Sequence, residues 1–217
     1  LHMFVHSVNV ALIASILGQW LKFSEKDIRI LTISGLLHDI GKIMIPNEIL
    51  TKPGKLTVAE YNIMKQHVNF GYEKVKNQNI DIRIKEACLL HHEKCDGTGY
   101  PFGLKSDHIP AVAKIIAIAD VYDAMTSARV YRGALCPFEV IDTMYKDAFT
   151  KFEPEYILPF LKNVASSYIN NDVRLSDGRI GKVVLINENA LSLPIVQCED
   201  EFIDLSKTRG LTVSAIL

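Results

Sequence analysis

Apolar residues recur at helical spacing along most of the chain, and this periodicity predicts a mainly α-helical protein. Residues 1–21 contain no Asp, Glu, Lys or Arg and approach the length of a membrane-spanning helix. They also include His2, His6, Asn9 and Gln19, polar side chains that are costly in lipid but acceptable in a protein interior. We therefore predict a buried helix here, with no membrane contact from this segment.

Residue pairs typical of helix N-termini predict where further helices begin. Ser24 with Asp27 resembles a capping box, and the helix that it starts is expected to end at Gly41. Thr57 with Glu60 resembles a second capping box, at the start of a helix that is expected to continue through His67. Other helices are expected at four places: from Asp81 to His92, from Pro110 through Asp120, near 137–149 and near 154–168. The predicted core positions are Ile28, Leu31, Leu36, Leu37, Ile115, Ile116 and Ile118.

The pattern changes to alternation near the C-terminus. Residues 173–186 predict two strands joined by a turn at Asp177–Gly178. Residues 194–198 and 201–205 could add two short strands. We therefore divide the chain into a helical catalytic domain, 1–170, and a small β-rich appendage, 171–217, which could serve packing or dimer formation.

Composition limits the classes of partner. With 217 residues, 48% of them hydrophobic, and a net charge of −1, the chain reads as a soluble globular protein with no general attraction to DNA or RNA. Its four cysteines lack a Cys-x-x-Cys spacing, so we expect neither a zinc knuckle nor a disulfide framework. We therefore expect a cytoplasmic location. The start within a helix suggests a preceding sensory or regulatory region.

Histidine and aspartate side chains form a pattern typical of a site for two transition metals. The candidate ligands are His6, His38, Asp39, His67, His91, His92 and Asp120. His2 is a further possibility, since it lies four residues before His6 on the same helix face. Asp39 is the natural bridge between two metals, because each carboxylate oxygen can bind one ion.

Such a site favours hydrolysis of a phosphoester, because two metals acidify a shared water and stabilise the attacking and leaving oxygens. Lys42, Arg129 and Arg132 could hold phosphate oxygens. Lys42 could instead complement a helix dipole, and the two arginines could pair with surface carboxylates.

The ordered motifs resemble those of HD-GYP domains, a branch of the HD metal-dependent phosphohydrolases. They occupy five ranges: 6–10, 38–42, 67–71, 91–101 and 120–132. The resemblance implies a bacterial signalling enzyme that hydrolyses cyclic di-GMP by a metal-bridging hydroxide. It also implies the metal ligands named above, with iron or manganese as the metal, and catalytic roles for Asp39 and Lys42. The substrate-binding residues that it implies are Lys42, Tyr100, Asp123, Arg129 and Arg132.

The chain departs from the family pattern at His2, where members with three metals carry Glu. We therefore expect two metals, with a third less favoured, and linear pGpG as the product rather than GMP. Glu93 and Asp96 match the motif and could orient either His92 or the following turn. Two other readings stay open: hydrolysis of another cyclic dinucleotide, a nucleotide or a phosphomonoester, and a non-catalytic cyclic di-GMP sensor or interaction module.

Overall fold

A computed structural model describes residues 2–127 and 133–217, apart from the side chains of residues 2 and 3. The helices, with two 3₁₀ helices labelled η, are α1 (His2–Trp20), α2 (Glu25–Leu37), η1 (Ile40–Met44), α3 (Asn47–Leu50), α4 (Val58–Lys65), α5 (His67–Val75), α6 (Ile82–Leu90), η2 (Ser106–His108), α7 (Ala111–Thr126), α8 (Pro137–Lys146) and α9 (Pro154–Ser167). The strands are β1 (Asp172–Leu175), β2 (Ile180–Leu185), β3 (Ile195–Cys198), β4 (Glu201–Asp204) and β5 (Val213–Ile216).

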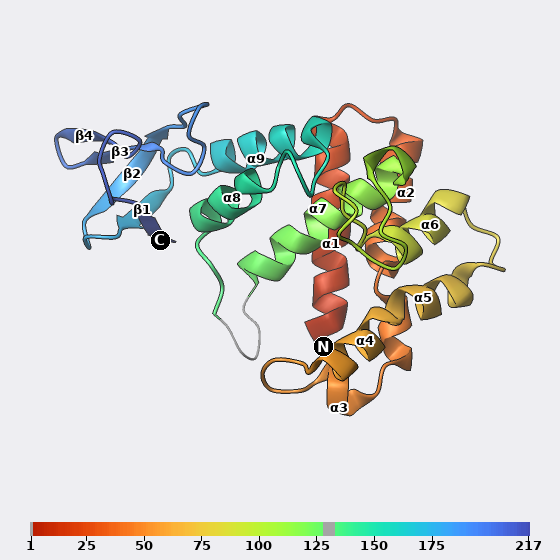
Figure 1. Cartoon of the computed structure of the whole chain (residues 1–217). Helices are drawn as coiled ribbons and strands as arrows, with labels where there is room; N and C mark the ends of the chain where they lie inside the picture. The colour runs from red at the N-terminus through yellow and green to blue at the C-terminus, as the bar shows by residue number, and fades with distance from the viewer. Residues whose placement is uncertain (1, 128–132) are drawn as a thin grey trace.

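Helix α7 lies at the centre of the helical part. It contacts α1, α2, α6, α8 and α9 (Figure 1). Its buried apolar side chains face several neighbours, and Ile115, Ile116 and Ile118 are fully buried as predicted. Asp120 and Asp123 are also buried on this helix, at 9% and 4% exposure. A polar group is stable in such a place only with partners, so these two aspartates mark where polar groups from other helices converge.

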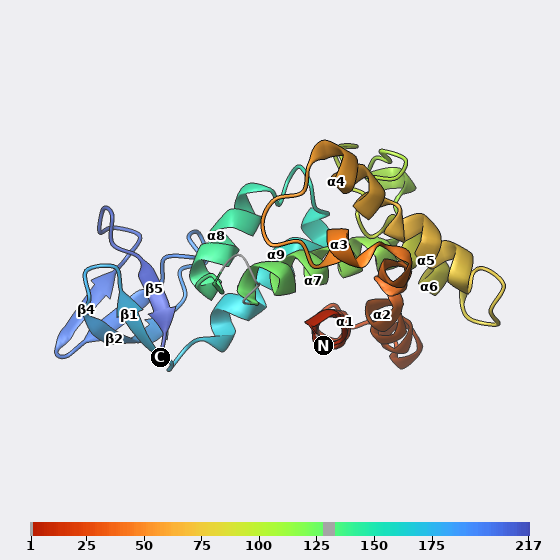
Figure 2. The same cartoon turned by 90° about the horizontal axis from the view of Figure 1, so that it is seen from below.

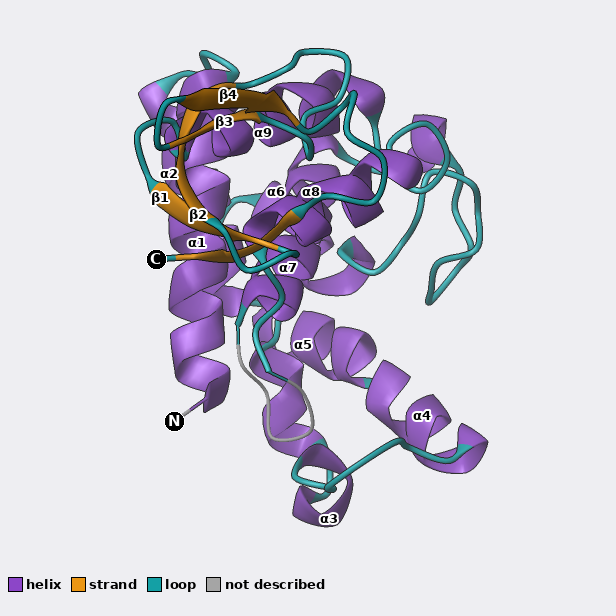
Figure 3. Cartoon of the chain, turned by 90° about the vertical axis from the view of Figure 1, so that its left-hand side faces the viewer, coloured by secondary structure: helices purple, strands orange, loops and turns teal. Residues whose placement is uncertain are grey.

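The C-terminal strands form one antiparallel sheet in the order β4-β3-β2-β1-β5. The sheet lies at one end of the molecule, beside α8 and α9 (Figures 1 and 3). Val173 and Leu175 of β1 belong to the same buried cluster as Phe138 of α8 and Phe160 of α9. The predicted mainly α fold with a small C-terminal sheet is confirmed; β5, which pairs with the distant β1, was not predicted.

Two helix predictions need correction. Ser24 caps α2, since its hydroxyl accepts from the Asp27 backbone N–H at 3.2 Å, but α2 ends at Leu37 and not at Gly41. Gly41 lies in η1, where a Cβ atom would come within 1.9 Å of the His67 carbonyl oxygen. Glycine there permits close approach of η1 to α5 instead of ending a helix. The helix expected to continue through His67 is likewise two helices, α4 and α5.

Burial predictions were wrong at two places. Leu36 is 42% exposed, because it lies on the outer face of α2 and not toward the core. Helix α1 is buried on one side only: Phe4, Leu12 and Ile16 are exposed at 69%, 56% and 42%, and Figure 2 shows this helix at the edge of the molecule. Over residues 2–127 and 133–217, none of the helices combines the length and apolarity that a bilayer crossing requires.

Candidate metal centre

Helix ends and helix middles both contribute to the cluster of candidate ligands. His6 comes from α1 and Asp120 from the middle of α7. The other ligands lie where helices begin or end: His38 and Asp39 between α2 and η1, His67 at the first residue of α5, and His91 and His92 directly after α6. Because a chain changes direction at a helix end, neighbouring side chains there can point to one place.

The described residues form two compact groups around one shared carboxylate. One group holds Asp39, His67, His91 and His92, and the other holds His6, His38 and Asp39; within each, one potential ligand atom per residue lies within 4.8 Å of the others. Asp39 Oδ1 is 3.4 Å from His67 Nε2 and 3.9 Å from His91 Nε2. Asp39 Oδ2 is 3.3 Å from His38 Nε2 and 3.7 Å from His6 Nε2. Each oxygen therefore faces a different group.

Asp120 reaches both groups from the opposite side. Its Oδ1 is 3.0 Å from His6 Nε2, and its Oδ2 is 3.8 Å from His92 Nδ1. Two carboxylates thus span the cluster, one from the α2–η1 junction and one from α7. Two carboxylates at this place favour the binding of cations.

Hydrogen bonds to the main chain orient three of the imidazoles. Nδ1 of His38, His67 and His91 donates to the carbonyl oxygens of Gly35, Met64 and Ala87 at 2.7, 2.7 and 2.9 Å. A carbonyl can only accept, so the proton must lie on Nδ1. In its neutral form, each of these rings therefore turns an unprotonated Nε2, the atom that binds metals, toward the cluster.

Unsatisfied buried atoms test whether a metal fits. His38 Nε2 and Asp39 Oδ1 are buried and have no hydrogen-bond partner among the described residues. Leaving such an atom unpaired costs about 1–3 kcal/mol, and more for a charged group. A cation coordinated by these atoms would remove that cost. The donor set, imidazole nitrogen with carboxylate oxygen, is one that divalent transition metals accept, so the cluster could bind metal.

The pKa values follow from burial and charge. Burial, which disfavours a charged imidazole, lowers the pKa of His67, lowers that of His91 further, and lowers that of His92 to about 3. Burial alone would raise the pKa of Asp39, but His38 and Lys42 hold it well below its ordinary value. His67, His91 and His92 therefore favour the neutral imidazole form, and Asp39 favours the carboxylate form, which are the forms that coordinate metal.

His6 and His38 differ from the other three histidines of the cluster. Burial acts to lower the pKa of His38, but the charge of Asp39 and a hydrogen bond with it outweigh burial and raise the pKa. Burial likewise acts to lower the pKa of His6, but hydrogen bonds with Asp120 and Asp123 outweigh burial and raise the pKa to about 9. Asp123 Oδ2 lies 2.6 Å from His6 Nδ1. Its Oδ1 accepts from Asn9 Nδ2 at 2.8 Å and from the Ser127 hydroxyl at 3.0 Å. Asp123, predicted as a substrate-binding residue, thus contacts His6, Asn9 and Ser127 in the structure.

Two other predicted residues lie at the mouth of the cluster. Lys42 Nζ is 2.5 Å from Asp39 Oδ2, and the Lys42 side chain is 22% exposed. The Tyr100 ring stacks on His92, with centroids 4.7 Å apart and planes at 28°. Both can therefore reach a ligand above the cluster. Arg129 and Arg132 lie outside the described residues, as does the His2 side chain.

The loop that carries Tyr100 folds back on the ligands. The Glu93 carboxylate accepts from the backbone N–H groups of Phe102 and Leu104 at 2.7 and 2.9 Å, and Glu93 is 4% exposed. The Tyr100 backbone N–H donates to the His92 carbonyl at 3.1 Å. Asp96 accepts from the Thr98 N–H and hydroxyl. Glu93 and Asp96 thus hold the turn, the second of the two roles left open by the sequence.

Three comparisons bear on this geometry. A family model described as "HD domain" matches residues 2–156. The cyclic di-GMP phosphodiesterase PA4108 of Pseudomonas aeruginosa is 36% identical over 195 residues, covering 89% of this chain and 47% of that protein. The cyclic di-GMP phosphodiesterase response regulator RpfG of Xanthomonas campestris is 41% identical over 155 residues, covering 70% of this chain and 41% of that protein. The chain thus spans less than half the length of these two relatives.

A solved structure agrees in fold. Bd1817, a HDG"Y"P protein from Bdellovibrio bacteriovorus, superposes with a TM-score of 0.60 at 24% identity, covering 71% of this chain and 50% of that chain. At this identity the likeness concerns the fold alone. The fold of the matched part of the chain is therefore also found in a solved structure.

Proposed function

This chain belongs to the HD domain family, and from that premise we propose that it is a metal-dependent phosphodiesterase that hydrolyses cyclic di-GMP. The observation that carries the proposal is the position of Asp39, whose two oxygens face different groups of histidines. The two relatives named as cyclic di-GMP phosphodiesterases support the choice of substrate.

The residues proposed to hold the metals are His6, His38, Asp39, His67, His91, His92 and Asp120. When bound, a pair of divalent metals supplies Lewis-acid polarisation of phosphoryl oxygens and acidification of water. Asp39 holds the two halves of the cluster together. The Asp123 carboxylate fixes the ring of His6 by accepting a hydrogen bond from its Nδ1–H. The Nε2 atom of His6 is then directed at the cluster.

The substrate contacts in this proposal come from the mouth of the cluster. Lys42 moves its ammonium group from Asp39 to a phosphoryl oxygen, because a cation stabilises the charge that builds up there during displacement. Tyr100 provides a flat wall beside His92 against which a base or ribose can lie. Arg129 and Arg132 stay in the proposal as further phosphate-binding residues.

Metal number and product are linked in this proposal. We propose two metals, iron or manganese, and linear pGpG as the product. A third metal would involve His2, four residues before His6 on α1, and would extend hydrolysis to GMP.

The test uses protein purified without oxygen and loaded separately with iron or manganese. Metal per chain is measured by mass spectrometry, and cyclic di-GMP incubated with each sample is followed by chromatography. We expect about two metals per chain and release of pGpG. The Asp39→Ala variant is the control; it should lose metal from both groups and abolish turnover.

Other outcomes would select other functions. Faster turnover of another cyclic dinucleotide, a nucleotide or a phosphomonoester would keep the hydrolase and change the substrate. Tight binding of cyclic di-GMP without turnover by fully metallated protein would indicate a sensor or interaction module. Wild-type metal content and rate in Asp39→Ala would contradict the bridging role. The cytoplasmic location, a homodimer, a preceding regulatory region and a domain boundary at 170/171 remain predictions.

A further inference from the structure

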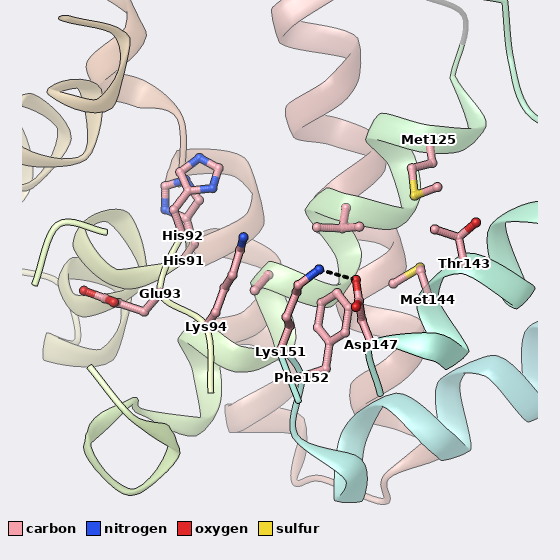
Figure 4. Close-up of a pocket in the computed structure, with 12 residues that line it drawn as sticks. His91, His92, Glu93, Lys94, Met125, Thr143, Met144, Asp147, Lys151 and Phe152 are labelled. Atoms are coloured by element: carbon pink, nitrogen blue, oxygen red, sulfur yellow. Dashed lines mark hydrogen bonds and ion pairs between the residues drawn. The ribbon is translucent and has the colours of Figure 1, made fainter. Parts of the chain in front are cut away.

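A cavity of about 220 Å³ opens beside the ligand cluster. The segment from His91 to Lys94 lines one part of it, and residues of α7, α8 and the segment after α8 line the rest (Figure 4). Because His91 and His92 also belong to the candidate metal centre, the cavity adjoins the centre. Lys42 and Tyr100 do not line this cavity, so it is a separate part of the site.

The cavity has largely apolar walls and a polar edge. The apolar side chains are Ala117, Val121 and Met125 of α7, Met144 of α8, and Phe152. The charged ones are Glu93, Lys94, Asp147 and Lys151, and Figure 4 shows the two lysines side by side between the histidines and the methionines. Apolar walls with a few polar groups at one edge are typical of small-molecule sites.

The size of the cavity limits what it can bind. Sites for whole small molecules begin at about 300 Å³, and this cavity is smaller. It therefore suits one fragment of a dinucleotide, and a base is the flat, largely apolar fragment that such walls accept. Phe152 adds an aromatic face, which favours stacking with a base.

Asp147 supplies the polar edge. Its carboxylate forms an ion pair with Lys151 Nζ at 2.8 Å, and its side chain is 33% exposed. An ionised carboxylate has about four acceptor positions, so Asp147 can keep Lys151 and still accept from a ligand. Guanine presents two adjacent donors, N1–H and the N2 amino group. Adenine presents an acceptor at N1, which a carboxylate would repel.

We propose that this cavity binds one guanine of the substrate and that Asp147 is a specificity-determining residue, accepting from guanine N1–H and the N2 amino group. The inference rests on the proposed function, since it assumes a guanine dinucleotide.

The test compares Asp147→Asn with Asp142→Asn in the full, metal-loaded chain. Asp142 is a matched control, because it also pairs with a lysine four residues later, Lys146, at 2.6 Å, yet does not line the cavity. For each protein, kcat/KM is measured for cyclic di-GMP and for bis(p-nitrophenyl) phosphate, a diester without a base. We expect the ratio of the two to fall about 10- to 100-fold in Asp147→Asn and to keep its wild-type value in Asp142→Asn.

The results separate the inference from the proposed function. A wild-type ratio in Asp147→Asn, or an equal loss on both diesters, would overturn the guanine subsite. Hydrolysis of bis(p-nitrophenyl) phosphate but not of cyclic di-GMP by the wild type would overturn the proposed substrate instead. A Lys151→Met variant checks the ion pair: if it lowers the ratio as much as Asp147→Asn does, loss of that pair explains the change and the hydrogen bonds to guanine do not.

Discussion

Asp39 is a buried carboxylate that is surrounded by histidine rings and a lysine. It is 2% exposed and lies within 4 Å of four histidine rings and of the Lys42 ammonium. Removing an ionised carboxylate from water is costly unless cations replace the water. Lys42 supplies one positive charge on Oδ2, while Oδ1 has no hydrogen-bond partner within the described part of the chain. A cation bound at Oδ1 would satisfy this oxygen.

Substitution of Lys42 tests whether turnover and metal binding depend on its positive charge. In Lys42→Ala we expect metal content to stay at the wild-type value, because lysine is not a ligand, and turnover to fall about 100-fold through loss of a preorganised cation. Metal analysis and steady-state rates are measured on the same samples. Lys42→Arg, which keeps the charge, should retain more of the rate. An unchanged rate in Lys42→Ala would assign this lysine a structural role only.

Glu93 acts on the site through the backbone. Its buried carboxylate binds two N–H groups of the loop that places Tyr100 on His92. Gly99 lets that loop approach, since a Cβ atom there would come within 2.4 Å of the Glu93 Cα atom. We therefore regard Glu93 as a positioning residue, which acts on the site by holding this loop.

For Glu93→Gln we expect the free energy of unfolding to fall by about 2 kcal/mol, because an NH₂ group, which cannot accept a hydrogen bond, replaces one of the two carboxylate oxygens that accept from the backbone. Metal content should not change, whereas KM should rise as Tyr100 loses its fixed position. Urea denaturation and steady-state kinetics measure these effects. Asp96→Asn, in the exposed turn of the same loop, should change stability by less than half as much. Loss of metal in Glu93→Gln would contradict a purely positional role.

At the scale of elements, a polar contact ties three helical segments together at the edge of the site. The Glu153 carboxylate, at the start of α9, accepts from Lys114 Nζ of α7 at 2.6 Å and from the Ser106 hydroxyl of η2 at 2.5 Å. Cys95 and Lys151 join the neighbouring loops by a backbone hydrogen bond. The loop that follows His92 is therefore anchored to the segment that carries Asp147.

The pH dependence of stability tests this contact. The hydrogen bond from Lys114 and then that from Ser106 lower the pKa of Glu153 below its ordinary 4.5. A lowered folded-state pKa stabilises the fold above pH 4.5, and this contribution is lost as pH falls through the lowered value. Glu153→Gln should thus cost about 1 kcal/mol at neutral pH, since the pair is partly exposed.

The cost should shrink in acid, when the wild-type carboxyl is itself protonated. Urea denaturation of both proteins at neutral pH and below pH 4.5 measures the difference. Glu155→Gln, an exposed change in the same first turn of α9, is the control and should have a small effect at both pH values. An equal cost of Glu153→Gln at every pH would show that the contact is not electrostatic.

At the scale of the molecule, the candidate ligands come from α1, the α2–η1 junction, α5, the end of α6, and α7. Metal bound there would link segments that are far apart in sequence, from His6 to Asp120. Because an unfolded chain cannot hold these ligands together, metal binding should stabilise the folded state.

We expect removal of metal by a chelator to lower Tm, and re-addition of iron or manganese to restore it. At a free metal concentration about 1,000 times the Kd, the stabilisation is about 4 kcal/mol. Differential scanning calorimetry at several metal concentrations measures it. Asp39→Ala should show a much smaller shift, and an equal shift in that variant would place the stabilising metal elsewhere.

The sequence by itself determined the types of element and the types of ligand. Ser24, Thr57 and Asp81 cap helices as predicted, and the strands around the Asp177–Gly178 turn form. These features depend on interactions between residues close in sequence, so the sequence contains the signal. The candidate ligands could be chosen because imidazole and carboxylate in such a set are uncommon away from metals.

Only the tertiary structure decided where these groups meet. It set each oxygen of Asp39 toward a different histidine group, placed Asp123 against His6, and brought Asp147 to a cavity beside His92. It also left one side of α1 exposed and paired β5 with β1. These outcomes depend on how elements distant in sequence pack against each other, and helical or strand periodicity carries no information about which neighbour each face will meet.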